Sequence, residues 1–183
     1  MTDIAAPAHR FLLLPGWLDS DAAHWQSRWA ALHACRRVEQ ADWLWPKRGD
    51  WMARLDEVLL ESNRPAVLIA HSLGCHLVAA WAAHSQHTDR VRAALLAAIP
   101  DTARDDMPPN LHAWREIERR PLPFASLAVI SSDDPYCSPG RAEQIARSWG
   151  AAAFDLGPGG HINGESGLGD WPQGWALVKR LLR

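Results

Sequence analysis

The feature that most constrains this chain is a buried strand that runs directly into a serine-bearing turn and a helix. Residues 66–70, Ala-Val-Leu-Ile-Ala, have no polar position to face water, which is typical of a central strand in a parallel sheet. The sequence His-Ser-Leu-Gly follows at 71–74, and an apolar helix is predicted over 73–85. A strained turn of this kind needs small residues two positions either side of the serine, as Ala70 and Gly74 are. The segment therefore predicts a reactive serine, Ser72.

The rest of the chain alternates strand-like and helix-like segments. Strands are predicted at 10–15, 66–70, 93–99, 127–131 and 151–156, with a weaker candidate at 38–43. Helices are predicted at 21–34 with Asp21 as N-cap, and at 49–60, 73–85, 141–149 and 175–182. This alternation predicts a single α/β domain over residues 1–183, with a mostly parallel sheet of about six strands flanked by helices.

One proline-bounded segment, residues 101–123, interrupts the alternation. It contains a single helical piece around 111–118. We interpret the segment either as a small cap over the site or as an ordinary crossover helix with irregular ends.

Two backbone N–H groups are candidates for holding a negatively charged oxygen beside Ser72. The Leu73 N–H lies at the start of the predicted helix, where the helix dipole favours negative charge. A second donor is expected from the loop after the first strand, and we assign it to Trp17, with Leu18 as the alternative. Each such donor is typically worth roughly 3 kcal/mol of transition-state stabilisation.

A nucleophilic serine needs a base, and the base needs a carboxylate that orients it. His161 lies in the glycine-rich loop after the last predicted strand. In α/β domains with a reactive serine on a strand–helix turn, the base follows the serine and the acid in chain order. Asp134 follows the 127–131 strand and precedes a proline, which holds it in extended backbone. We predict Asp134 as the acid, with Asp133 as surface or a local turn cap, and Asp101 as a further alternative.

Composition excludes several other classes of function. A formal net charge of −2 argues against binding to nucleic acid or to an anionic membrane. The three cysteines show no zinc-ligand spacing, and no phosphate-binding or dinucleotide fingerprint is present, so we expect neither a metal nor a cofactor. The first fourteen residues lack the pattern of a secretory signal, so we expect a cytoplasmic protein with reduced thiols.

Tryptophan is unusually abundant, with eleven Trp against one Tyr and three Phe. Large rings in loops beside the motifs are candidates for a substrate pocket. From loop position we predict that Trp17, Trp25, Trp114, Tyr136 and Ile162 line it.

Taken in order, these motifs resemble the small α/β-hydrolase family of retinoblastoma-binding protein nine and its bacterial relatives. The resemblance covers nearly the whole chain. It rests on Pro-Gly-Trp at 15–17, His-Trp-Gln at 24–26, and the serine motif at 71–74. It continues with Ser-Asp-Asp-Pro at 132–135, Gly-His-Ile-Asn at 160–163, and Trp-Pro at 171–172.

The resemblance implies a compact α/β-hydrolase fold with little or no lid. It also implies a catalytic triad of Ser72, Asp134 and His161, and it favours Asp134 over Asp133. Ala70 departs from the glycine usual at its position.

The predicted function is that of a serine hydrolase cleaving small acyl esters through an acyl-enzyme, with a small-molecule acyl substrate as its partner. Amide or thioester cleavage by the same residues stays open, because all three bonds pass through similar tetrahedral intermediates. The alternative is a non-catalytic, partner-binding protein that keeps the hydrolase fold. The sequence makes no prediction about oligomeric state.

Overall fold

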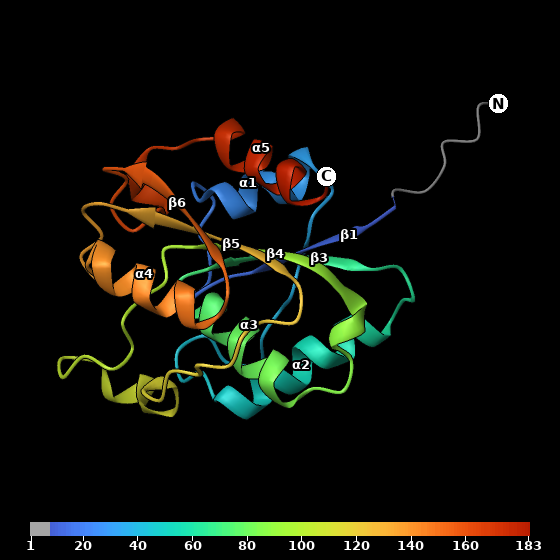
Figure 1. Ribbon diagram of the computed structural model, residues 1–183, viewed down its shortest axis with the longest axis horizontal. Coiled ribbons are helices and arrows are strands. Elements are labelled where there is room, and N and C mark those ends of the chain that lie inside the picture. Colours follow the sequence, from blue (N-terminus) through green and yellow to red (C-terminus); the bar gives the residue numbers. More distant parts are fainter. Residues whose placement is uncertain (1–7) are drawn as a thin grey trace.

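The computed structural model describes residues 8–183. Its centre is a sheet of six parallel strands in the order β2-β1-β3-β4-β5-β6 (Figure 1). The strands are β1 Arg10–Leu14, β2 Arg36–Arg37, β3 Ala66–His71, β4 Val91–Ala97, β5 Ala125–Ser131 and β6 Ala152–Gly157. The helices are α1 Trp25–Leu32, α2 Arg48–Leu60, α3 Leu73–His84, α4 Pro139–Ser148 and α5 Pro172–Leu181. Residues 8–183 also contain three short 3-10 helices: η1 Thr88–Arg90, η2 Pro109–Trp114 and η3 Gly164–Ser166.

Helices cover both faces of the sheet, because the central strands are apolar on both sides. On β3, Leu68 packs with α2, α3 and α4, whereas Val67 and Ile69 point the other way and pack with α1 and α5. Figure 1 shows the same division, with α1 and α5 above the sheet and α2 and α3 below it. All six residues of β3 are buried, as the run of apolar residues predicts. Within residues 8–183, no helix is both long and apolar enough to cross a membrane.

The predicted α/β fold is confirmed, but three predicted elements are either absent or differ by four residues or more at one end. The 38–43 segment is not a strand: β2 is confined to Arg36–Arg37, and Asp42 accepts hydrogen bonds from the Leu44 and Trp45 amides, which turns the chain. The 21–34 helix begins only at Trp25, because Asp21 caps the preceding turn through the Ala23 and His24 amides. His24 is the N-cap.

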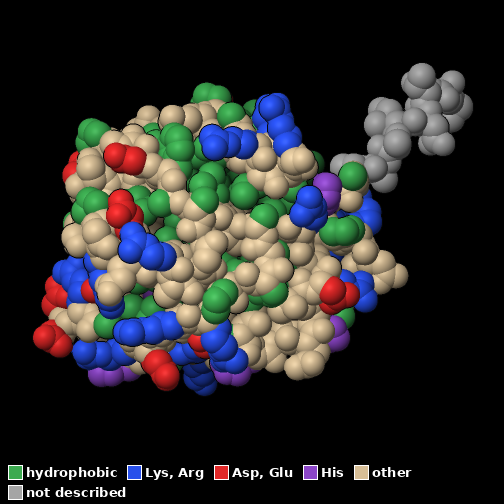
Figure 2. Space-filling model, viewed as in Figure 1, with side chains coloured by type: hydrophobic (Ala, Val, Ile, Leu, Met, Phe, Trp, Pro, Cys, Tyr) green, Lys and Arg blue, Asp and Glu red, His purple; other side chains and the backbone are tan. Residues whose placement is uncertain are grey.

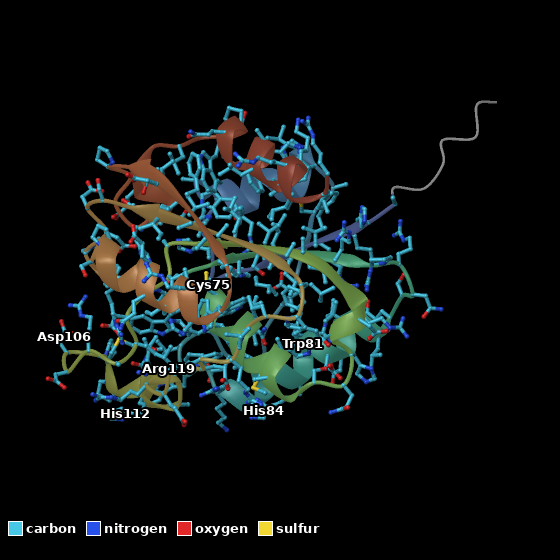
Figure 3. The ribbon with its side chains drawn as sticks, in the orientation of Figure 1. Cys75, Trp81, His84, Asp106, His112 and Arg119 are labelled. Atoms are coloured by element: carbon cyan, nitrogen blue, oxygen red, sulfur yellow. The ribbon has the colours of Figure 1, made fainter. Side chains whose placement is uncertain are left out.

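The third difference is the segment between β4 and β5. Its helical piece is the 3-10 helix η2 over Pro109–Trp114, not a helix over 111–118. Pro108 at the N-cap and Pro109 at the first position mark where η2 begins, because the N–H groups that these prolines lack would have no partner within a helix. Figure 3 places Asp106 and His112 of this segment at the outer edge of the molecule. In Figure 2, Lys and Arg side chains lie mostly along the lower left of the view, mixed with Asp and Glu.

Candidate active site

Ser72 occupies the sharp turn between β3 and α3. Its backbone lies at φ 53° and ψ −123°, a region that non-glycine residues rarely adopt. Two neighbours make the turn possible by their small size. A Cβ on Gly74 would lie 2.2 Å from the Leu14 carbonyl oxygen, so only glycine fits there. Ala70 is fully buried, and the sheet accommodates its methyl group in place of the usual glycine.

A continuous series of hydrogen bonds joins Ser72 to His161 and Asp134. The Ser72 Oγ lies 2.8 Å from His161 Nε2, and His161 Nδ1 lies 3.0 Å from both carboxylate oxygens of Asp134. Because the carboxylate only accepts, it holds the proton of a neutral imidazole on Nδ1 and leaves the Nε2 lone pair facing the serine hydroxyl. The amide of Tyr136 donates to Asp134 at 2.9 Å and holds the carboxylate in place.

The two other candidate acids have different partners. Asp133 accepts from the Ser131 hydroxyl and from the amides of Gly159 and Gly160, at 2.8, 2.9 and 2.8 Å. These hydrogen bonds lower the pKa of Asp133, the serine bond most of all. Asp133 thus ties β5 to the loop that carries His161. Asp101 instead forms an ion pair with Arg141 at 3.1 Å.

The candidate backbone donors near Ser72 differ in whether they already make a hydrogen bond. The Leu73 amide is in the first turn of α3, where amides have no partner within the helix. The Leu18 amide donates to the Trp43 carbonyl at 3.2 Å, so it is already used. The Trp17 amide makes no hydrogen bond with any residue of 8–183, and Gly16 brings this loop against Ser72.

A cavity of about 480 Å3 opens onto Ser72 and His161, a volume typical of sites for small molecules. The loop after β1 and the segment after β4 both line it, the latter with Met107, Pro108 and Leu111 among others. The segment over 101–123 therefore lines the site from one side, although it contains no α-helix.

Of the five residues predicted to line the pocket, the structure places two there, Trp17 and Tyr136. The prediction is wrong for the other three, Trp25, Trp114 and Ile162, which are buried in the core. The indole N–H groups of Trp25 and Trp114 donate to the carbonyls of Ile162 and Pro46, at 2.7 Å each. Loop position alone misplaced these residues, because it does not say whether a ring faces the cavity or the core.

Three further histidines in this part of the fold are buried. Burial lowers the pKa of His24 and of His76 to about 4, and that of His71 well below its usual value. His24 lines the cavity, with Nδ1 accepting from the Gln26 amide and a buried Nε2 that has no hydrogen-bond partner among the described residues. Cys75 lies in the interior (Figure 3), and burial raises its pKa well above the usual value, so its thiol is not a nucleophile.

A parallel sheet covered by helices on both faces, with a serine on the turn after a central strand, defines the α/β hydrolases. The particular family follows from the sequence: the chain belongs to the serine hydrolase family, whose model matches residues 11–180. No curated protein matches the chain.

Solved structures agree with this fold. A Pectobacterium atrosepticum protein described as YdeN-like is 30% identical, with a TM-score of 0.80, over 94% of this chain and 88% of the other. The ydeN gene product of Bacillus subtilis is 17% identical with a TM-score of 0.71, over 95% and 98% of the two chains. The RedJ thioesterase of Streptomyces coelicolor is 16% identical with a TM-score of 0.71, over 96% and 86%.

Proposed function

We propose that the protein hydrolyses small acyl esters, with Ser72 as nucleophile, His161 as general base and Asp134 as the residue that orients the base. The observation that carries the proposal is the unbroken hydrogen bonding from Asp134 through His161 to Ser72, the last two of which line the cavity. A protein that only binds a partner gains nothing from this arrangement together with a strained serine backbone.

In the first half of the reaction, His161 Nε2 takes the Ser72 proton while Ser72 Oγ attacks the carbonyl carbon. The amides of Leu73 and Trp17 donate to the oxyanion of the tetrahedral intermediate. The intermediate collapses to an acyl-enzyme, and His161 gives the proton to the departing alcohol. Asp134 stabilises the imidazolium that exists between these two transfers.

In the second half, His161 takes a proton from water as the water attacks the acyl-enzyme. A second tetrahedral intermediate forms at the same two amides, and its collapse returns the proton to Ser72 and releases the acid. The walls of the cavity, among them Met107, Pro108 and Leu111, are mainly apolar and favour a short apolar acyl group.

The test is labelling by a fluorophosphonate probe beside turnover of p-nitrophenyl acetate. Wild type and Ser138→Ala, which removes an exposed serine at the start of α4, are expected to label and to turn over substrate. Ser72→Ala is expected to do neither while keeping its melting temperature. A folded wild type that neither labels nor turns over the ester overturns the proposal and favours the non-catalytic alternative.

A panel of matched acetyl esters, thioesters and amides then compares the three leaving groups. We expect the highest kcat/KM for the oxygen ester. A kcat/KM at least tenfold higher for the thioester would make thioesters the proposed substrates instead.

A further inference from the structure

The loop that carries His161 is held by side chains from distant parts of the chain. Within it, Ile162 adopts φ 49°, a left-handed conformation that is unfavourable for a β-branched residue. Such a conformation persists only where its surroundings impose it. On the amide side of the loop, Asp133 accepts from Gly159 and Gly160.

The carbonyl side of the loop is held by two buried rings. His71 Nε2 lies 2.8 Å from the carbonyl oxygen of His161, and Trp25 Nε1 donates to the carbonyl oxygen of Ile162 at 2.7 Å. His71 is 5% exposed and Trp25 is 1% exposed, so both bonds are shielded from water. His71 directly precedes Ser72 in the sequence, and Trp25 is the first residue of α1. Their rings nevertheless bond to the carbonyls of two consecutive residues, His161 and Ile162.

The chemistry of His71 suits this task. A carbonyl oxygen only accepts, so His71 must carry its proton on Nε2. Burial keeps the ring neutral by lowering its pKa well below the usual value. The His71 and His161 rings are only 5.0 Å apart, centre to centre. A neutral His71 can hold the loop without opposing the positive charge that His161 acquires during the reaction, as a charged ring would.

We propose that His71 and Trp25 are positioning residues, which place the His161 imidazole by donating to the carbonyls of His161 and Ile162. His71 borders the cavity, but the role proposed for both residues is exerted through the base. The inference rests on the proposed function, since it gives a role to residues that support its general base. A displacement of about 1 Å in a catalytic group can cost roughly 100-fold in rate, so two hydrogen bonds on its backbone are sufficient to matter.

The chain offers a matched pair of tryptophans for the test. Trp29 is on the same helix as Trp25 and is equally buried, and its indole N–H donates at 2.7 Å to the carbonyl of Asp170, outside the His161 loop. Trp25→Phe and Trp29→Phe each remove one indole donor. We expect similar losses of melting temperature, an approximately tenfold lower kcat with unchanged KM for Trp25→Phe, and a kcat within twofold of wild type for Trp29→Phe. Equal kcat values for the two variants would overturn the proposal.

A second set of variants tests His71 through its coupling to the base. Gln keeps an amide donor near the position of Nε2, so His71→Gln is expected to retain most of the activity that His71→Leu loses. In a His161→Ala background, His71→Leu should cause no further loss of the residual activity, because its target is gone. A further loss as large as in the wild-type background would mean that His71 acts on Ser72 directly, contrary to the proposal.

A measurement without substrate separates this inference from the proposed function. Imidazole 1H–15N NMR signals of His161 are expected to shift or broaden in Trp25→Phe and to stay unchanged in Trp29→Phe. That result in a protein that hydrolyses no ester would support the positioning role and overturn only the proposed reaction. Unchanged His161 signals in both variants, with wild-type turnover intact, would overturn the positioning role alone.

Discussion

Gly16 lies so close to Ser72 that a Cβ on the glycine would come within 2.7 Å of the Ser72 Cβ. The same atom would lie 3.3 Å from the His71 carbonyl oxygen, so it would meet backbone as well as side chain. Gly16 therefore sets how closely the Trp17 amide approaches Ser72.

Gly16→Ala is expected to push the loop after β1 away from Ser72 and to lower kcat/KM for p-nitrophenyl acetate by about 100-fold, the typical cost of one lost oxyanion donor. The matched control is Gly49→Ala in α2, where a Cβ meets nothing within 4 Å. That variant should keep full activity and gain up to about 1 kcal/mol of stability from helix propensity. Full activity in Gly16→Ala would show that the loop does not supply the donor.

Substitutions of the neighbouring Asp133 and Asp134 are expected to differ in their effects on kcat. Asp134→Asn leaves the shape of the site intact but no longer holds the Nδ1 proton of His161, and kcat should fall by about 10,000-fold. Asp133→Ala leaves the Gly160 amide without an acceptor and the Gly159 amide with only the Ser131 hydroxyl, so it should lower both the melting temperature and kcat, the latter by about tenfold. Steady-state kinetics with circular dichroism melting measures both. A larger kcat loss in Asp133→Ala than in Asp134→Asn would exchange their assigned roles.

The buried histidines should make the protein sensitive to mild acid. His76 is 4% exposed, its Nε2 lies 2.8 Å from the Pro100 carbonyl, and burial lowers its pKa from 6.5 to about 4. The unfolded chain therefore binds a proton more readily than the folded one. The stabilisation that comes from a neutral His76 is complete above pH 6.5 and is lost as the pH falls towards 4.

His76→Gln removes this titration while keeping a donor for Pro100. Between pH 7.5 and 5.0, wild type should lose about 2 kcal/mol more unfolding free energy than the variant, as measured by urea denaturation. Identical losses in the two proteins would show that His76 is not the source of the acid sensitivity.

The size of the cavity should determine which acyl groups are accepted. Met107 lines the cavity and is partly buried. Met107→Trp fills part of this space, so kcat/KM for p-nitrophenyl hexanoate is expected to fall by about tenfold relative to the acetate. The acetate serves as the internal control, because its methyl group requires little of that volume. An unchanged hexanoate-to-acetate ratio would place the acyl group elsewhere in the cavity.

Much of the fold and the candidate site was predictable because the relevant signals are local. The apolar run of β3, the small residues beside Ser72 and the glycine-rich loop before His161 each act within a few residues. Their order along the chain, with Asp134 between them, is a property of the sequence itself. A parallel sheet then brings the carboxyl ends of its strands to one edge, where these residues meet.

Contacts between distant segments were not predictable in this way. In the sequence, nothing distinguishes Trp25 and Trp114 from residues that line a pocket. In the structure their rings are buried in the core, and backbone carbonyls accept their indole N–H groups. The role of Asp133 in holding the His161 loop likewise depends on how β5 and β6 lie beside each other.

The sequence by itself determined the strand–turn–helix at Ser72, the order of the three candidate catalytic residues and the α/β class, because each depends on backbone geometry and short-range pattern. Only the tertiary structure decided which aspartate reaches His161, which amide stays free for an oxyanion and which rings face the cavity. Those outcomes depend on the direction of side chains across gaps of tens to more than a hundred residues, such as the 137 positions between Trp25 and Ile162. Packing of the whole core fixes such directions, and no local pattern encodes them.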